Sequence, residues 1–265
     1  MPVLGDWDIT DLDMCISPAM LANGDAPASF DEGTFPVFVP SGGQEIKAWL
    51  TDGAKYEDGQ LLFPNTTSLL KVLNWKKIFT STSNWTAEAW VETRKIQRLV
   101  SVIFSWQRFG VGTYEQFYAG IGEGDRQYLI SFYSQLTGAD CTALSHIIEP
   151  LDYVPSMHLV FRKTGATFDF FRNGVVEPYY GYQIPWTGGV LDIISPLIIG
   201  NYSMIDFATW MPDYPLNFRG GIQSVCFYND AISEQRIADN YALGPTYGGL
   251  KGSLKKKQQS LLIIP

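Results

Sequence analysis

The sequence predicts an all-β sandwich of two antiparallel sheets, and three observations support this fold class. Between residues 60 and 230, short runs of β-branched and aromatic residues are separated by turn signals. Aromatic residues make up 14% of the chain, a proportion that suits strands. Only residues 234–243 carry the pattern of a helix, so helices cannot provide the framework.

Composition limits the classes of protein to which the chain can belong. With 265 residues, 46% of them hydrophobic, it can fill one large β domain with appendages or two small ones. A formal net charge of −8 and a pI near 4.8 argue against nucleic acid as a partner, because phosphate binding needs clustered Lys and Arg. No apolar run reaches the roughly 18 residues of a membrane helix, so no membrane insertion is expected.

The first residues of the sequence and the cysteines bear on the cellular compartment of the protein. Residues 1–14 contain four Asp where a secretory signal would have a basic stretch and then an apolar run, so no secretory signal is expected. The three cysteines, Cys15, Cys141 and Cys226, are an odd number without a CxxC spacing. This pattern favours buried, small apolar side chains over a disulfide framework or a zinc site.

The chain divides into three parts along the sequence. Residues 1–59 are rich in Gly, Pro and Asp and predict an irregular N-terminal arm with two strands. Residues 60–243 hold the alternating runs of the sandwich. Residues 244–265 form a Gly-rich linker, a basic cluster and an apolar end, which is a separate element by composition.

Alternation within the sandwich predicts which side chains face the core. Met157, Leu159 and Phe161 alternate with His158 and Arg162, so one face of that strand is core. The same period makes His158 a sheet histidine with a polar partner. Asn173-Gly174 between two such runs is a hairpin turn dipeptide. Gly220-Gly221 before the last strand permits a close backbone approach or a bulge. Ser233 is the expected N-cap of the helix, which Gly244 and Pro245 end.

The order of these runs resembles the laminin-G-like jelly roll, a branch of the concanavalin A-like lectin and glucanase superfamily, over residues 60–243. LLFPNTTSL is similar to that family's first core strand, NWTAEAWVE to its "F-T-I-E-A-W-V" strand and VIFSW to its "I-F-S" strand. MHLVFRKTGATFDFFRNGVV resembles the central hairpin, PLIIGNYS the "L-x-I-G-N" segment, and FRGGIQSVCFYNDAISEQRIADNY the closing strand and helix. The resemblance implies a jelly-roll sandwich with one short C-terminal helix and extended N- and C-terminal arms.

The resemblance also bears on cofactors. Many relatives carry an acidic pair in the closing strand that contributes to a structural calcium site, whereas this chain has Gln223-Ser224. We therefore expect no cofactor and no metal, although Asp52, Asp58 or Asp169 could supply oxygen ligands to calcium.

Catalytic residues are not expected. Retaining glucanases of the superfamily carry an E-x-D-x-x-E strand with two carboxylates about 5 Å apart, and this chain has no such string. Glu88 and Glu92 are four residues apart, or about 13 Å along a strand, which is too far for that double displacement. A glycoside hydrolase is the least favoured of the functions considered.

Candidate ligand-binding residues lie on one strand and in two aromatic loops. Glu88, Trp90 and Glu92 share a face opposite Trp85, Ala87, Ala89 and Val91, and would offer a stacking plate and hydroxyl acceptors if that face lined a groove. The competing interpretation is that Trp90 is core. Trp186 in one loop, and Trp210 and Tyr214 in another, either cap the sandwich or make a contact surface.

The tail favours membership of a larger assembly. Its candidate assembly residues are a basic cluster and an apolar terminus, namely Lys255, Lys256, Lys257, Leu261, Leu262, Ile263 and Ile264. We expect a non-enzymatic structural or attachment protein, such as a bacteriophage decoration, head or tail-fibre protein with a lectin-like domain. Its expected partners are other virion subunits, further copies of itself and a cell-surface glycan, and its expected location is a virion assembled in the host cytoplasm. A free carbohydrate-binding lectin is the alternative.

Overall fold

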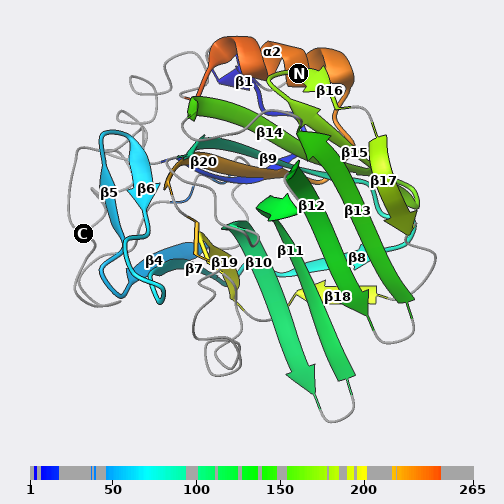
Figure 1. The fold of residues 1–265 in the computed structure, drawn as a ribbon, viewed down its shortest axis with the longest axis horizontal. Helices are drawn as coiled ribbons and strands as arrows, with labels where there is room; N and C mark the ends of the chain where they lie inside the picture. The colour runs from blue at the N-terminus through cyan, green and yellow to red at the C-terminus, as the bar shows by residue number, and fades with distance from the viewer. Residues whose placement is uncertain are drawn as a thin grey trace.

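In the computed structural model the chain folds into two antiparallel sheets packed face to face, with one helix on the outer face of the second sheet (Figure 1). The structure describes residues 3–4, 7–17, 37, 39, 46–93, 101–110, 113–124, 127–136, 139–147, 154–177, 179–184, 190–193, 196–201, 217–218 and 220–245. The predicted fold class, a two-sheet sandwich with one short C-terminal helix, is confirmed.

The first sheet joins eight strands. Their order is β17 (Tyr179–Ile184), β13 (Ala139–Ile147), β12 (Gln127–Leu136), β11 (Thr113–Gly124), β10 (Ser101–Gly110), β19 (Leu197–Ile199), β7 (Leu69–Leu73) and β4 (Lys47–Thr51). Strands β10 to β13 follow one another as antiparallel neighbours, whereas β19 connects β10 to β7 across a long stretch of chain.

The second sheet is built around β9. Its order is β16 (Val175–Val176), β15 (Thr167–Arg172), β14 (Val154–Thr164), β9 (Trp85–Thr93), β20 (Gly220–Tyr228), β6 (Gln60–Leu62) and β5 (Lys55–Glu57), with β3 (Leu12–Ile16) also paired to β20. Two small pairs complete the set: β1 (Val3–Leu4) with β2 (Trp7–Asp8), and β18 (Val190–Ile193) with β8 (Lys77–Thr80).

The alternation predicted for the strands separates two apolar clusters. Every second residue of β9, together with Met157, Leu159 and Phe161 of β14, lies in the main core between the sheets. The opposite face of the second sheet carries a smaller cluster beneath helix α2 (Glu234–Leu243). Its buried members are Leu12, Cys15, Trp90, Val160, Phe171, Cys226, Tyr228, Ile232 and Ile237.

Local signals in the sequence place the turns and the helix correctly. Asn173 and Gly174, both with positive φ, form the two-residue turn between β15 and β16. A Cβ atom on Gly220 would lie 1.9 Å from the Glu92 carbonyl oxygen, so the close backbone approach expected there is confirmed. Ser233 caps α2 by accepting a hydrogen bond from the Arg236 amide, and Gly244 ends the helix.

The N-terminal arm is more regular than predicted. Residues 1–59 contribute β3 and β5 to the second sheet and β4 to the first, in addition to the β1–β2 pair. Burying Leu12, Met14 and Ile16 of β3 stabilises its docking by about 4.5 to 9 kcal/mol. Ordering the five residues of the strand costs about 5 to 10 kcal/mol, so noncovalent docking of β3 is nearly balanced.

A disulfide joins Cys15 of β3 to Cys226 of β20, where the two residues are direct partners in the ladder. Their expected burial is correct, since 1% of Cys15 and 0% of Cys226 is exposed. The expectation that they are unpaired is wrong, because pairing of β3 with β20 brings together side chains that are 211 residues apart in sequence. Cys141 lies on β13, in a part whose side chains are not described.

A buried ammonium group fixes the turns at one end of the second sheet. Lys163 is 0% exposed, and its Nζ donates to the carbonyl oxygens of Thr80, Ser81, Ser83 and Gly165 at 3.0, 3.0, 2.6 and 2.5 Å. These four acceptors come from two separate turns. The side chain therefore ties the turn after β8 to the hairpin between β14 and β15.

We predict that Lys163→Met lowers the free energy of unfolding by about 3 kcal/mol, because four partly buried carbonyl groups lose a charged donor. Urea denaturation followed by tryptophan fluorescence measures the change. Lys55→Met is the control, since the Lys55 side chain is 40% exposed in its pair with Glu57 and should change stability by less than about 1 kcal/mol. Equal losses in the two variants would show that the carbonyl contacts contribute nothing specific.

Candidate functional site

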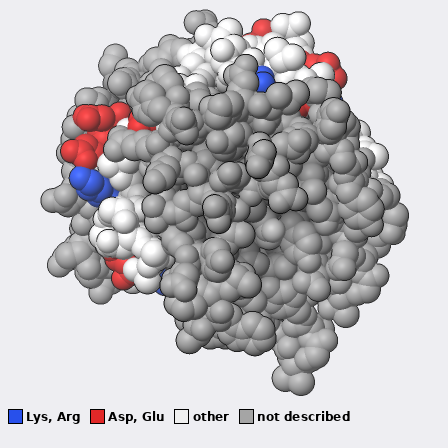
Figure 2. Space-filling model, viewed as in Figure 1, with Lys and Arg blue, Asp and Glu red and all other residues white. Residues whose placement is uncertain are grey.

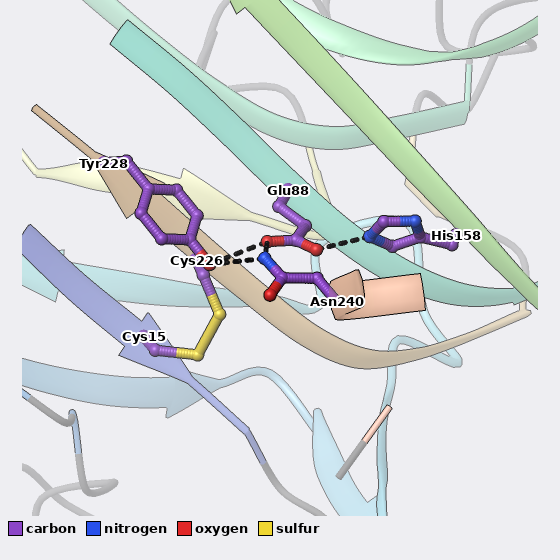
Figure 3. Close-up of a disulfide and its surroundings, with 6 residues drawn as sticks. All are labelled: Cys15, Glu88, His158, Cys226, Tyr228 and Asn240. Carbon is purple, nitrogen blue, oxygen red and sulfur yellow. Dashed lines mark hydrogen bonds and ion pairs between the residues drawn. A yellow bond between two sulfur atoms is a disulfide. The ribbon is translucent and has the colours of Figure 1, made fainter. Parts of the chain in front are cut away.

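A buried carboxylate lies between the second sheet and helix α2 (Figure 3). Glu88 of β9 is 0% exposed, and His158 Nε2 of β14 lies 2.5 Å from its Oε1. The hydroxyl of Tyr228 on β20 and Nδ2 of Asn240 on α2 donate to its Oε2 at 2.7 and 3.0 Å. These four residues, the Glu88 cluster, connect three adjacent strands to the helix.

Aromatic rings seal the Glu88 cluster from one side. Trp90 stacks on Tyr241 of α2 with ring centroids 5.7 Å apart and an interplanar angle of 10°. The same indole lies 4.8 Å from the imidazole of His158. Because 4% of Trp90 is exposed, the ring serves as packing between sheet and helix.

The proposed glycan face on β9 therefore needs correction. Glu88 and Trp90 lie on a face opposite Trp85 and Ala87, as the alternation predicts, but that face is covered by α2 and does not line a groove. Glu92 is 8% exposed at the far end of the strand. A sugar could not stack on Trp90 unless the helix moved away. The histidine prediction is confirmed, since His158 has Glu88 as its polar partner.

The other candidate residues lie outside the described part of the chain. They are Trp186, Trp210 and Tyr214 of the aromatic loops, and the tail residues Lys255, Lys256, Lys257, Leu261, Leu262, Ile263 and Ile264. They stay predictions from the sequence.

A surface pocket of about 430 Å³ lies beside the Glu88 cluster. Residues from the chain before β3 form one wall, and residues from the end of β20 to the end of α2 form the other. This α2 pocket is lined by Asp8, Thr10, Asp11, Asp230, Ala231, Ile232, Ser233, Gln235, Arg236, Asp239, Asn240 and Leu243. Asn240 belongs to both sites, so the Glu88 cluster positions the helix that forms one wall.

Arg236 holds the two walls of the α2 pocket together. Its Nη2 donates to the carbonyl oxygens of Asp8 and Thr10, each at 2.6 Å, and its guanidinium lies 4.9 Å from the centre of the Tyr228 ring. The side chain is 12% exposed. Nη2 is thus bonded to the protein, and the guanidinium is a structural link.

Acidic side chains dominate the charge of the α2 pocket. Partial burial raises the pKa of the Asp8 carboxyl, but the Thr10 amide, which donates to Oδ1 at 2.9 Å, and the Arg236 charge together hold that pKa below its usual value. Asp11, Asp230 and Asp239 are all exposed, and Figure 2 shows acidic side chains at this corner, over α2. The pocket is therefore a negatively charged, polar site at neutral pH.

The described residues offer no metal centre. No group of three or more His, Cys, Asp or Glu side chains among them is arranged to hold an ion. Of the carboxylates considered for calcium, Asp169 pairs with Arg162 at 2.9 Å, and Asp52 and Asp58 occupy turns with positive φ. No helix within the described ranges has the length and hydropathy needed to cross a membrane.

Residues of the α2 pocket were missed by sequence reasoning, although one signal was present. Arg236, Asp239, Asn240 and Leu243 recur at spacings of three and four, which puts them on one stripe of the predicted helix. The opposite wall could not be foreseen, because Asp8 and Thr10 reach the helix only through the pairing of β3 with β20.

Several solved structures share this fold at low sequence identity. One is domain 4 of AbnA, a GH43 extracellular arabinanase from Geobacillus stearothermophilus, in complex with arabinotriose. It is 11% identical to this chain with a TM-score of 0.50, and the match covers 86% of this chain and 97% of that domain's chain. Trypanosoma rangeli sialidase in complex with sialic acid is 15% identical with a TM-score of 0.56 and covers 88% of this chain. A complex of that sialidase with 2,3-difluorosialic acid gives 14% identity and a TM-score of 0.56.

These likenesses show the fold, a concanavalin A-like β-sandwich, and confirm the resemblance inferred from the sequence. The chain spans about a third of the sialidase, at 33% of that protein's length. No protein-family model matches the sequence, and no curated protein matches it significantly.

We predict that Glu88→Gln lowers the free energy of unfolding by about 3 kcal/mol, because an amide N–H₂ would replace an acceptor that faces buried donors. Glu57→Gln is the matched control, since Glu57 pairs with Lys55 at the surface, where its side chain is 48% exposed. Urea denaturation of both variants checks the difference. The interpretation fails if Glu88→Gln is as stable as Glu57→Gln.

Proposed function

We propose that this chain binds a glycan without hydrolysing it, and that it does so as the attachment domain of a larger assembly. The α2 pocket carries the proposal, since it gathers hydroxyl-binding side chains into a hollow of about 430 Å³. The likeness to the arabinanase domain in complex with arabinotriose supports the same function, because that structure is one separate domain of the arabinanase and is matched over 97% of its length.

The lining of the α2 pocket indicates a class of sugar. Carboxylates at Asp11, Asp230 and Asp239 accept hydrogen bonds from hydroxyl or ammonium groups, and Gln235 can both donate and accept. Arg236 is the only cationic side chain among the described residues of the lining, and its Nη2 is already bonded to two carbonyl groups. A carboxylate-bearing sugar would meet the like charge of the Asp side chains, so the pocket should favour neutral or amino-bearing glycans.

A binding role is also favoured over hydrolysis by the placement of the acidic residues in β9. Glu88 is enclosed by its three polar partners and by α2, so it has no access to a substrate. A pair formed by Glu88 and Glu92 would in addition be about 13 Å apart along the strand.

The assembly part of the proposal rests on the sequence of residues 251–265. A basic cluster at Lys255–Lys257 followed by the apolar run 261–264 suits docking to an acidic, strand-bearing neighbour, such as another subunit of a bacteriophage virion. A free lectin is the alternative. Mass measurement of the purified chain separates the two, since a lectin that acts alone requires no partner chains.

We predict that the chain binds arabinotriose or an oligomer of glucosamine, and that Asp239→Ala weakens this binding about tenfold or more. The loss follows from removal of one charge-assisted hydrogen bond, worth about 1.5 kcal/mol or more. Glu234→Ala is the matched control, because Glu234 lies on the same helix, 68% exposed, outside the pocket. Isothermal titration calorimetry measures both variants.

The same titration tests the charge argument with sialyllactose and an oligogalacturonate. We expect neither to bind, since both carry carboxylates. Binding of the acidic sugars alone, or equal effects of Asp239→Ala and Glu234→Ala, would contradict the assignment of the pocket.

We further predict that prolonged incubation with arabinan, β-glucan, alginate and peptidoglycan releases no reducing ends. A colorimetric reducing-sugar assay checks this, with a commercial hydrolase for each polymer as the positive control. Release that is lost in Asp239→Ala would instead make the α2 pocket an active site.

A further inference from the structure

The disulfide lies in the β3–β20 ladder that leads to the two walls of the α2 pocket. Cys226 opposes Cys15, and the pairs Phe227–Met14 and Tyr228–Leu12 follow along the ladder. Beyond them the Asn229 amide donates a hydrogen bond to the Asp11 carbonyl oxygen. From there the two chains diverge into the two walls of the pocket, one through Asp11 and the other through Asp230. Figure 3 shows the disulfide next to the Glu88 cluster, on the strand that carries Tyr228.

We propose that the oxidation state of Cys15 and Cys226 regulates ligand binding in the α2 pocket. With the disulfide formed, β3 stays docked and both walls are present. With the two thiols reduced, β3 undocks for a large share of the time and takes Asp8, Thr10 and Asp11 with it. This inference rests on the proposed function of the pocket and adds its regulation.

The favourable and unfavourable free-energy terms for docking β3 nearly cancel, and this supports regulation by the disulfide. Burial of its three apolar side chains about equals the cost of ordering the strand, so a covalent link decides whether it stays docked. The other contacts are the ladder with β20 and polar side-chain interactions. Asp13 accepts from Trp75 Nε1 at 2.5 Å and pairs with Lys77 at 2.8 Å. Just before β3, the Asp8 and Thr10 carbonyl oxygens accept from Arg236 Nη2. Both Lys77 and Asp13 are partly exposed, so solvent weakens that pair.

β3 can also separate from the second sheet without disrupting the pairing of the other strands. It pairs with β20 alone, off the main strand order, whereas β20 is held on its other edge by β9. Loss of β3 would remove one wall of the pocket and leave β9, β14 and the Glu88 cluster in place. Local opening of this kind lowers the apparent affinity, which becomes the affinity of the closed form multiplied by the fraction of molecules that remain closed.

The chemistry of the switch is thiol–disulfide exchange. A dithiol reductant such as dithiothreitol supplies two electrons and two protons, its thiolate attacks one sulfur, and the S–S bond breaks to give two cysteine thiols and the cyclic disulfide of the reductant. Because both cysteines are at most 1% exposed, the reductant gains access only when β3 opens. Reduction of the native protein should therefore be slow and should be accelerated by mild denaturant.

The first experiment counts thiols and needs no ligand. Chain purified without reductant and then denatured should show one reactive thiol, because two of its three cysteines are paired, and reduced chain should show three. Hydrogen exchange by mass spectrometry then compares oxidised and reduced chain. Exchange in residues 7–17 should rise on reduction, while residues 85–93 stay protected.

The second experiment measures arabinotriose and a glucosamine trisaccharide by calorimetry, with and without dithiothreitol. We expect affinity to fall at least tenfold on reduction and in Cys15→Val/Cys226→Ala, a pair of apolar replacements chosen to keep the packing. Cys141→Ser is the control and should retain the affinity of the oxidised chain. Far-UV circular dichroism confirms that each variant is folded.

The outcomes separate this inference from the proposed function. If neither sugar binds the oxidised chain, the proposed function fails, and hydrogen exchange alone decides the inference. Three reactive thiols in chain isolated without reductant would overturn it, as would equal exchange of residues 7–17 in the oxidised and reduced states. Unchanged affinity after complete reduction would overturn it as well.

Discussion

The carboxylate of Glu88 is the interaction on which this corner of the molecule depends. A charge taken out of water must be matched by donors, and here β14, β20 and α2 each provide one. The three elements are thereby held in one relative position. The helix is short and buries only Ile237 and Asn240, so packing alone would locate it less specifically than this network does. Because Asn240 belongs to both the Glu88 cluster and the α2 pocket, the network also fixes the position of the helical wall of the pocket.

Much of the fold was predictable because it depends on local rules. Period two in the β14 segment assigns Met157 and Phe161 to the core, Asn173-Gly174 sets the hairpin, and Ser233 and Gly244 bound the helix. The contribution of residues 1–59 was not predictable in the same way. β3 is a short strand whose partner, β20, lies about two hundred residues further along the chain, and no local pattern identifies that partner.

The candidate site, like the fold, was predictable from the sequence only in part. The sequence places Glu88 and Trp90 on one face of a strand, but whether such a face meets solvent or another element is decided by where the helix after β20 folds back. The disulfide was missed for a related reason, since an odd number of cysteines without a motif carries no pairing information. Asp8 lies far from Asp230 and Asp239 in the sequence, and only the topology brings the three to one hollow.

The pairing of β3 with β20 has a consequence for synthesis of the chain. Leu12, Met14 and Ile16 leave the ribosome early, yet the strand that covers them follows about two hundred residues later. At a translation rate of about 5 to 20 residues per second, these apolar side chains and the Cys15 thiol wait on the order of 10 to 40 s for their partner. The nascent chain therefore exposes an apolar segment that is available to chaperones until β20 has been synthesised.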